Sequence, residues 1–205
     1  SIKSLKDLIW LGSILNSNFK IDPSQIRSFN DLIARRAYRK EPVAYLLNKK
    51  EFWSMKFKVN KDVLIPRPET EILVEALVKY YKGHDPFILD IGTGSGCIII
   101  SLLQELKQSK GVAIDISNKA LKIAKKNSKI LNISNRIKFV KASICNFNSF
   151  KFDLIVSNPP YIARHQLKNL DVGIKKFEPK IALDGGNDGL DVIRKVIYKS
   201  RKILK

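Results

Sequence analysis

Hydrophobic and polar positions follow a regular order from residue 86 onward. Four segments are apolar at nearly every position, and segments with apolar residues at helical spacing lie between them, near 97–108 and 118–131. The four apolar segments are 87–91, 111–115, 137–140 and 152–156. Strands that are apolar on both faces are typical of a parallel sheet covered by helices on each side. The pattern therefore predicts an α/β fold with right-handed crossovers.

The first 48 residues have the period of a helix instead. Apolar residues recur at helical spacing from Leu5 to Leu15. Asp22-Pro23-Ser24 is typical of a helix start, and a helical pattern continues from Ile26 to Tyr38. Residues 1–48 are therefore predicted to form a small helical segment.

A period of two appears at residues 51–65. Apolar side chains occupy every second position from Trp53 to Val59, which predicts a half-buried strand. Asn60-Lys61-Asp62 then predicts a turn, and residues 63–65 a returning strand. Residues 49–66 are thus expected to form a β-hairpin linker.

A further helix is expected directly after this linker. Pro66 and Pro68 interrupt the strand pattern, because proline lacks the N–H group that a strand ladder needs. Thr70 follows as a candidate N-cap, and the helix should run to about Tyr81.

Composition limits the class of protein. Hydrophobic residues make up 44% and charged residues 28% of the 205 residues, which is typical of a globular chain with a core. The longest apolar run, Cys97–Leu103, is too short to cross a bilayer, and the start of the chain does not resemble a signal peptide. Cys97 and Cys145 have no metal-ligand spacing. We therefore expect a cytoplasmic protein with reduced thiols, no bound metal and no membrane partner.

The net charge of +19 leaves one question about partners open. Basic chains often bind nucleic acid or other polyanions. However, lysine far outnumbers arginine, and the lysines are scattered along the chain without an arginine-rich stripe. Direct binding of nucleic acid is therefore compatible with the sequence but not favoured by it.

A glycine-rich loop follows the first apolar segment. The sequence from Asp90 to Gly96 is Asp-Ile-Gly-Thr-Gly-Ser-Gly, and a helical pattern begins directly after it. Glycines at such a position let the backbone turn sharply and approach a ligand closely. Asp115 ends the second apolar segment, where a carboxylate can accept hydrogen bonds from both hydroxyls of a ribose. The loop and the acid together predict an adenosine-containing cofactor.

The motif Asn158-Pro159-Pro160-Tyr161 follows the fourth apolar segment. Ligands bind at this carboxyl edge of an α/β sheet. The Asn158 side-chain oxygen and the Pro159 carbonyl can accept hydrogen bonds from both N–H groups of a planar amino nitrogen. These acceptors would also stabilise the positive charge that grows on the nitrogen during methyl transfer, while the Tyr161 ring packs on the planar group. The motif predicts methylation of an amide or aryl amino group.

With these motifs in place, the chain resembles the HemK/PrmC family of release factor glutamine methyltransferases from about residue 41 to its end. The matching stretches are Glu41–Leu46, Glu51–Trp53, Leu64–Glu71, Asp90–Gly96, Ser157–Ile162, Phe177–Pro179 and Ala182–Leu190. The Asn-Pro-Pro-Tyr motif is shared with adenine-N6 methyltransferases of DNA and RNA. The segment around Arg67-Pro68-Glu69-Thr70 is more characteristic of the resembled family.

The resemblance implies a class I S-adenosylmethionine-dependent, Rossmann-like methyltransferase domain at 67–205, after a helical substrate-binding segment at 1–48 and the linker. It implies N5-methylation of the glutamine in the Gly-Gly-Gln motif of class 1 peptide chain release factors. The residues expected to bind S-adenosylmethionine are Gly92, Thr93, Gly94, Ser95, Gly96, Asp115, Ile144 and Asn158. Those expected to hold the glutamine are Asn158, Pro159, Pro160 and Tyr161, of which Asn158, Pro159 and Tyr161 are the expected catalytic residues. Arg67 to Thr70 would line the cofactor side, and no general base is implied.

The chain departs from the family pattern in two places. Ser143 stands where the family has an acidic residue, and Ile144 takes the place next to the adenine, so weaker adenine recognition is expected. The family's sheet gains three strands after the helix that begins near Leu190, whereas this chain stops at Lys205. We therefore expect a sequence truncated at its C-terminus, with 152–156 as an exposed edge strand.

Two alternatives to the glutamine methyltransferase remain at this point. The first is an amino-group methyltransferase that acts on adenine N6 or guanine N2 of DNA or RNA. The second is an inactive remnant of the fold that binds a partner. Transfer of a labelled methyl group to a release factor, to nucleic acid or to neither would separate the three hypotheses.

Overall fold

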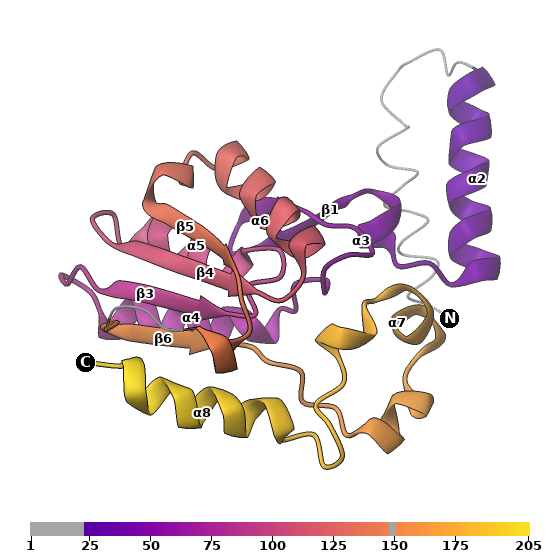
Figure 1. Ribbon diagram of the computed structural model, residues 1–205. Coiled ribbons are helices and arrows are strands. Elements are labelled where there is room, and N and C mark those ends of the chain that lie inside the picture. Colours follow the sequence, from indigo (N-terminus) through magenta and orange to yellow (C-terminus); the bar gives the residue numbers. More distant parts are fainter. Residues whose placement is uncertain (1–22, 148–150) are drawn as a thin grey trace.

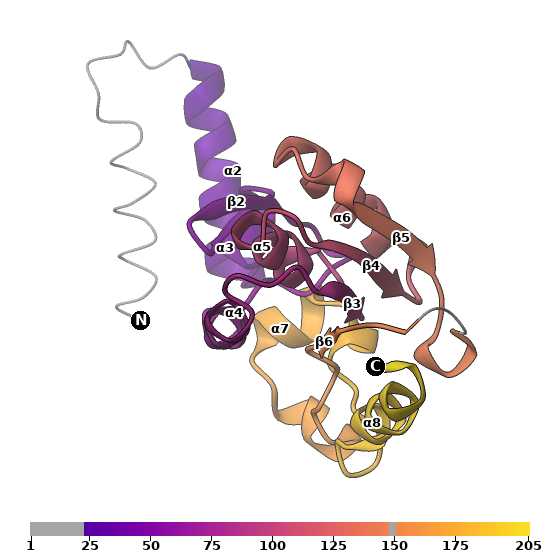
Figure 2. The same cartoon turned by 90° about the vertical axis from the view of Figure 1, so that its left-hand side faces the viewer.

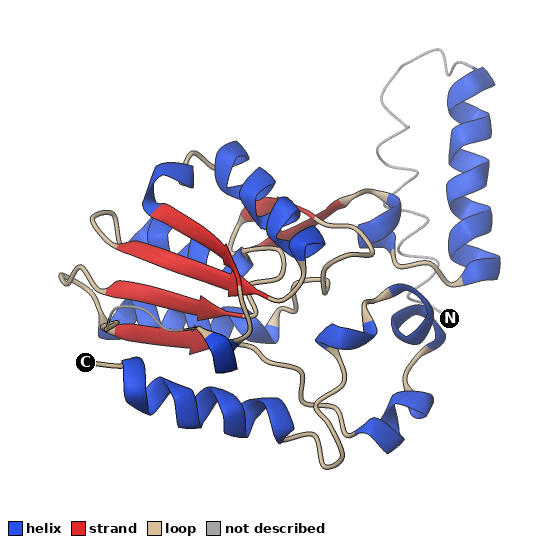
Figure 3. Ribbon diagram, viewed as in Figure 1, coloured by secondary structure: helices blue, strands red, loops and turns tan. Residues whose placement is uncertain are grey.

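The computed structural model describes residues 23–147 and 151–205. Its centre is a four-stranded parallel sheet with helices on both faces (Figures 1 and 3). The strands are β3 (Phe87–Ile91), β4 (Lys110–Asp115), β5 (Ile137–Lys141) and β6 (Leu154–Ser157). Their order across the sheet is β5-β4-β3-β6, and each neighbouring pair is parallel. The predicted α/β fold and its four strands are confirmed.

Helices connect the strands and extend the chain on either side of them. They are α2 (Pro23–Arg39), α3 (Val43–Leu46), α4 (Glu69–Tyr80), α5 (Cys97–Glu105), α6 (Asn118–Ile130), α7 (Val172–Phe177) and α8 (Asp191–Ile203). Short 3-10 helices are η1 (Ser134–Arg136), η2 (Ile144–Asn146), η3 (Arg164–Asn169) and η4 (Lys180–Ala182). The helix predicted at 26–38 is part of α2, which extends away from the sheet in Figures 1 and 2. The pattern from Leu5 to Leu15 lies outside the described residues.

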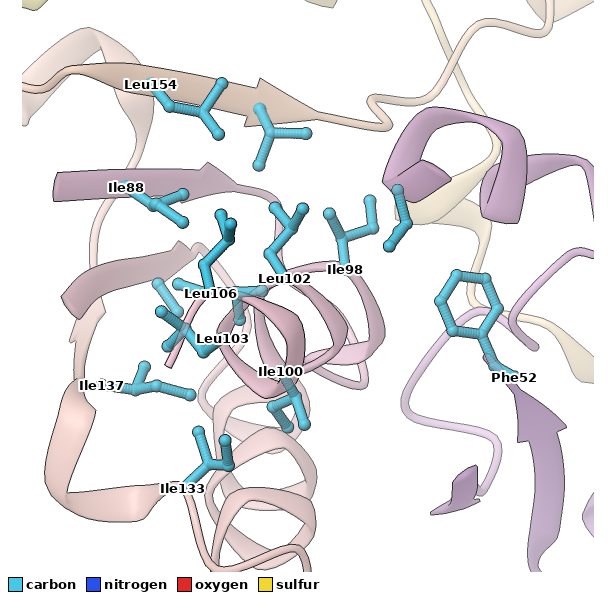
Figure 4. Packing of buried hydrophobic residues seen from close by; sticks show 14 of the residues in the cluster. Phe52, Ile88, Ile98, Ile100, Leu102, Leu103, Leu106, Ile133, Ile137 and Leu154 are labelled. Carbon is cyan, nitrogen blue, oxygen red and sulfur yellow. The ribbon is translucent and has the colours of Figure 1, made fainter. Parts of the chain in front are cut away.

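The strands alternate their side chains between two buried layers. Ile88 and Leu154 face the α5 side of the sheet, where Figure 4 shows them opposite Ile98 and Leu102. Leu89 points to the other layer, which includes residues from the end of α8. Because helices cover both faces, successive strand residues are excluded from water, and this explains the continuous apolar runs in the sequence.

The linker forms a hairpin, but its turn lies elsewhere than predicted. β1 (Lys49–Phe52) and β2 (Met55–Lys58) pair antiparallel, with Trp53 and Ser54 as the two connecting residues. Both connecting residues have positive φ angles, 51° and 54°. Two-residue turns of this handedness match the twist of the strands they join. The prediction of a returning strand at 63–65 is wrong. The partner of β2 is β1, which precedes it in the sequence, and residues 63–65 form no strand.

Asn60–Asp62 forms a turn, as predicted, but this turn does not join two paired strands. The Asn60 Oδ1 atom accepts a hydrogen bond from the Asp62 N–H at 3.0 Å. Residues 63–65 follow this turn without forming a strand, and the Glu178 side chain takes the place of a neighbouring strand as their hydrogen-bond partner. The Ile65 N–H donates to Glu178 Oε2 at 3.2 Å, which brings this segment to the carboxyl edge of the sheet.

The helix after the linker begins before Thr70. α4 starts at Glu69, and Pro68 at its N-cap position already has helical angles, with φ −56° and ψ −36°. Proline is well suited to the first turn of a helix, since its fixed φ is helical and the first N–H groups lack partners anyway. Thr70 therefore lies inside α4, and the N-cap prediction for it is wrong.

β6 is the last strand at its side of the described sheet, as predicted, but the predicted exposure of 152–156 is wrong at its start, because Phe152 is fully buried and forms a parallel bridge with Leu204. The Phe152 N–H donates to the Ile203 carbonyl, and the Lys205 N–H donates to the Phe152 carbonyl, both at 2.9 Å. The end of α8 thus lies beside the start of β6. The expected truncation itself stays a prediction.

Candidate active site

A cavity of about 680 Å³ opens at the carboxyl edge of the sheet. Cavities of this size commonly hold a cofactor or a drug-sized ligand. The predicted site residues that line it are Gly92, Thr93, Gly94, Ser95, Asp115, Ile144, Asn158, Pro159 and Pro160. The structure therefore brings the glycine loop, the acid after β4 and the Asn-Pro-Pro segment around one space, although they are far apart in the sequence.

The glycine loop is pinned to the end of β4. Gly92 and Thr93 donate their N–H groups to the Ile114 carbonyl at 2.9 and 3.0 Å, and the Gly94 N–H donates to Asp115 Oδ2 at 3.0 Å. Gly92 and Gly94 have φ angles of 72° and 55°, which side chains with a Cβ rarely adopt. Gly96 also has a positive φ, but it does not line the cavity: a Cβ there would lie 2.9 Å from the Ile100 side chain.

Asp115 combines a structural role with free acceptor capacity. Its Oδ2 atom accepts from Gly94, and its Oδ1 atom accepts from the Ser117 N–H at 2.8 Å. Each carboxylate oxygen has two lone pairs, so one on each oxygen is left for a ligand in the cavity. This arrangement suits the predicted contact with two ribose hydroxyls.

Asp90 lies beneath the glycine loop and is completely buried. Its Oδ2 atom accepts from Thr93 Oγ1 at 2.7 Å, and its Oδ1 atom has no hydrogen-bond partner within the described part of the chain. Burial raises the pKa of this carboxyl to about 7. From the sequence, Asp90 was recognisable only as the start of the loop, although a carboxylate within an apolar strand is a signal for a specific role.

The end of the cavity near β5 is largely apolar. Ile144 is 7% exposed and contributes its side chain to this wall, together with Ile116 and Ala142. The Ser143 hydroxyl accepts a hydrogen bond from the Cys145 N–H at 3.3 Å, so it stabilises the η2 turn. Apolar walls of this kind suit a flat aromatic base, and the family's acidic residue is absent here.

The Asn-Pro-Pro segment is anchored at its first residue, Asn158, and at Ser157 directly before it. The Ser157 hydroxyl donates to the Ile91 carbonyl at 2.7 Å, and Asn158 Nδ2 donates to Thr70 Oγ1 at 3.2 Å. Pro159 and Pro160 are half-buried and line the cavity. Tyr161 is 62% exposed and is not among the lining residues. The structure thus separates the Tyr161 ring from the other predicted substrate residues.

A second glycine-rich loop supports this segment from behind. The Ile162 N–H donates to the Leu183 carbonyl at 3.1 Å, and the Gly185 N–H donates back to the Ile162 carbonyl at 2.9 Å. A Cβ on Gly189 would lie 2.5 Å from the Tyr161 carbonyl oxygen. Close backbone approach therefore explains Gly185 and Gly189 of the Ala182–Leu190 motif, which served in the sequence only as part of the resemblance.

Glu178 joins two segments of the cavity wall, and the sequence analysis assigned it no role. Its side chain is 1% exposed and binds Arg67 Nη2 through Oε1 at 2.6 Å. Its Oε2 atom accepts from the Ile65 N–H. Arg67 and the neighbouring Pro179 both line the cavity. The only available signal was an acid between Phe177 and Pro179 in an otherwise basic stretch.

Two further findings concern other kinds of site. No group of three or more His, Cys, Asp or Glu residues in the described ranges is placed to hold a metal ion. No helix among the described residues is long and apolar enough to span a membrane.

Comparisons with known structures identify the fold. The catalytic domain of hMettl16 in complex with a MAT2A 3'UTR hairpin superposes with a TM-score of 0.57 at 19% identity, over 90% of this chain and 66% of that one. At this level of identity the likeness shows only a shared fold. That fold is the class I S-adenosylmethionine-dependent methyltransferase fold.

Comparisons of sequence are more specific. The family model described as the methyltransferase small domain matches residues 68–176. The release factor glutamine methyltransferase of Clostridium acetobutylicum is 39% identical over 204 residues, which cover 98% of this chain and 70% of that protein. That of Buchnera aphidicola is 41% identical over 192 residues, covering 93% and 68%.

The release factor glutamine methyltransferase of Caulobacter vibrioides is 39% identical over 188 residues, 91% of this chain and 65% of that protein. The chain thus spans about two thirds of the length of these relatives. The aligned 204 residues span the glycine loop, Asp115 and the Asn-Pro-Pro segment, all of which line the cavity. The chain therefore belongs to the family of release factor glutamine methyltransferases.

Proposed function

We propose that this chain carries the active site of an enzyme that uses S-adenosylmethionine to methylate N5 of a glutamine side chain. The expected acceptor is the glutamine in the Gly-Gly-Gln motif of class 1 peptide chain release factors. The observation that carries the proposal is the position of the Asn158 amide at the wall of a cavity that also contains the glycine loop and Asp115. Names of relatives at about 40% identity support the choice of acceptor.

The cofactor fits the chemistry of the cavity walls. Gly92 to Ser95 offer closely approachable backbone, Asp115 offers acceptors for ribose hydroxyls, and Ile144 offers an apolar surface for adenine. S-adenosylmethionine, when bound, supplies an electrophilic methyl group. These residues would hold it, and the apolar lining would exclude water from the reacting atoms.

The acceptor nitrogen needs help because its lone pair is delocalised into the amide. Asn158 Oδ1 and the Pro159 carbonyl would accept hydrogen bonds from its two N–H groups and turn its lone pair toward the cavity. As positive charge grows on the nitrogen, the same two acceptors stabilise it. The excess proton can then leave to solvent, so the reaction requires no basic side chain.

Two further parts of the chain are assigned here to contact with the substrate protein. We assign residues 1–48, for which the sequence predicts helices, to contact with the release factor, and Tyr161 to packing on the glutamine amide once the loop of the substrate enters. A cytoplasmic location belongs to the same proposal, since the expected substrate takes part in translation. Nucleic acid is kept as an alternative acceptor because no acidic residue lies between Asp115 and Asp153, whereas that stretch has nine Lys and Arg residues.

The test is a transfer assay with methyl-labelled S-adenosylmethionine. The acceptors are a class 1 release factor, the same factor with its motif glutamine replaced, and structured RNA or DNA. We expect label in the unmodified factor only. Asn158→Ala should abolish transfer, while Asn118→Ala, on the exposed face of α6, serves as a matched control that should transfer normally. Label in nucleic acid alone, or in neither acceptor, would reject the proposed function.

A further inference from the structure

The orientation of the Asn158 side chain decides which face it presents to a substrate. A carboxamide has an acceptor oxygen on one side and a donor NH₂ group on the other. Here Nδ2 donates to Thr70 Oγ1 at 3.2 Å, and no described residue donates to Oδ1. The amide therefore keeps its oxygen as an acceptor for a group in the cavity.

Thr70 provides a fixed partner for this amide. It is the second residue of α4, is 9% exposed and lines the cavity. Its backbone N–H donates to the Arg67 carbonyl at 3.0 Å, and Val74, one turn further along α4, is completely buried. The hydroxyl thus stands on the anchored first turn of α4, a different element from the loop that carries Asn158.

We propose that Thr70 is a positioning residue that anchors the Asn158 amide at the cavity wall and thereby aligns an acceptor nitrogen that carries N–H groups. The proposal rests on the function proposed above. Without this anchor the amide is free to rotate, and its NH₂ group can then face the N–H groups of the substrate. Two donors cannot bond each other, so the substrate nitrogen would lose the contact that aligns it.

The variants Thr70→Val and Thr70→Ser test this role. Valine keeps the β-branched shape but has no acceptor for Asn158, whereas serine keeps the hydroxyl. For methylation of the release factor we expect kcat to fall about tenfold in Thr70→Val while KM changes much less, because alignment in the transition state is lost. Thr70→Ser should retain kcat within about threefold of the unchanged chain. Equal kcat values in all three proteins would overturn the proposal.

Cofactor affinity separates positioning from direct binding. Because Thr70 and Asn158 line the same cavity as the predicted cofactor residues, calorimetric titration of all three proteins with S-adenosylmethionine should show a dissociation constant that changes much less than kcat does. A weaker constant in Thr70→Val together with an unchanged kcat would assign Thr70 to cofactor binding and reject the positioning role. Thermal melts of each variant confirm that the comparison is between folded proteins.

The side-chain amide signals of Asn158 provide a readout that needs no turnover. In ¹⁵N–¹H spectra, assigned by their loss in Asn158→Ala, the two Nδ2 protons should shift and exchange faster with water in Thr70→Val and return in Thr70→Ser. Unchanged signals in Thr70→Val would contradict the proposed contact. This readout stands even if no release factor is methylated, so failure of the proposed function and failure of the positioning role are distinguishable.

Discussion

Individual site residues are held by partners that lie far away in the sequence. Asn158 binds Thr70 across a separation of 88 residues, and Glu178 binds Ile65 and Arg67 across separations of 113 and 111. Asn158 could be recognised from the sequence because it begins the Asn-Pro-Pro-Tyr motif, which directly follows a predicted strand at the ligand-binding edge of the sheet. For Thr70 the sequence predicted a helix cap and a place on the cofactor side but no contact with Asn158, and for Glu178 it predicted no role, since the use of a hydroxyl or a carboxylate depends on what faces it in the fold.

Gly189 provides a test of close backbone packing at the site. It has a φ of 84°, and a Cβ there would meet the Tyr161 carbonyl oxygen at 2.5 Å. We expect Gly189→Ala to lower the free energy of unfolding by about 3 kcal/mol and to reduce methyl transfer, because both the φ strain and the contact oppose it.

Gly83→Ala is the matched control for this substitution. Gly83 has a similar φ of 79°, but nothing lies within 4 Å of the added Cβ. It should therefore lose only about 1 kcal/mol, the cost of the left-handed conformation. Urea unfolding of both variants makes the comparison, and equal losses would exclude the close contact with Tyr161 as a cause.

The buried Asp90 carboxyl should make stability depend on pH in a defined window. Burial raises its folded-state pKa from 3.8 to about 7. Between these values only the unfolded chain releases the proton, so the contribution of Asp90 to stability is complete below about pH 4 and declines as pH rises to about 7.

Asp90→Asn removes this titration but can still accept from Thr93. The difference in unfolding free energy between the unchanged chain and Asp90→Asn should therefore decrease from pH 4.5 to pH 7.5 and then level off. Urea titrations across this range measure it. Curves that run parallel would mean that the pKa of Asp90 is the same in the folded and unfolded states.

At the level of elements, the hairpin shows where a local pattern is insufficient. Its turn contains Trp53 and Ser54, which are not the asparagine and glycine that favour positive φ angles. Tertiary contacts stabilise the turn instead: the Trp53 N–H donates to Glu71 in α4, and Trp53 Nε1 donates to Glu105 in α5. The alternation of apolar residues correctly predicted the strand β2, but it missed β1, wrongly added a strand at 63–65 and misplaced the reversal of the chain.

Asn127 connects three elements and offers a test of their docking. From α6, its Oδ1 accepts from the Lys58 N–H at 2.7 Å, and its Nδ2 donates to the carbonyls of Lys58 and Ser95. Asn127→Ala should cost about 3 kcal/mol of unfolding free energy, because backbone groups of the hairpin and the glycine loop lose their partners.

The exposed Asn118 of the same helix provides the control, and Asn118→Ala should change stability by less than about 0.5 kcal/mol. Calorimetric affinity for S-adenosylmethionine should fall in Asn127→Ala but not in the control, since the glycine loop loses an anchor. An Asn127 variant as stable as the control would show that the three elements dock without this side chain.

For the whole molecule, the net charge of +19 opposes folding through self-repulsion. Between Asp115 and Asp153 lies the acid-free stretch with nine Lys and Arg residues, several of them on the exposed face of α6. Salt screens such repulsion. Raising NaCl from about 0.05 to 0.5 M should therefore increase Tm by about 3 °C, which for this size corresponds to about 1 kcal/mol.

A variant with Lys122, Lys125 and Lys129 replaced by glutamine should show a weaker salt dependence, because these exposed lysines of α6 add to the repulsion. Differential scanning calorimetry measures both proteins at each salt concentration. A Tm that stays constant or falls with salt would mean that repulsion among like charges does not limit stability.

The sequence by itself determined the parallel α/β sheet, the glycine loop, Asp115 and the Asn-Pro-Pro segment. Burial on both faces requires continuous apolar strands, and ligand chemistry requires particular residues directly after them. Only the tertiary structure decided the turn at Trp53 and Ser54, the contact of Thr70 with Asn158 and the ion pair of Arg67 with Glu178. These features join segments that local patterns describe separately, and their geometry depends on packing between elements.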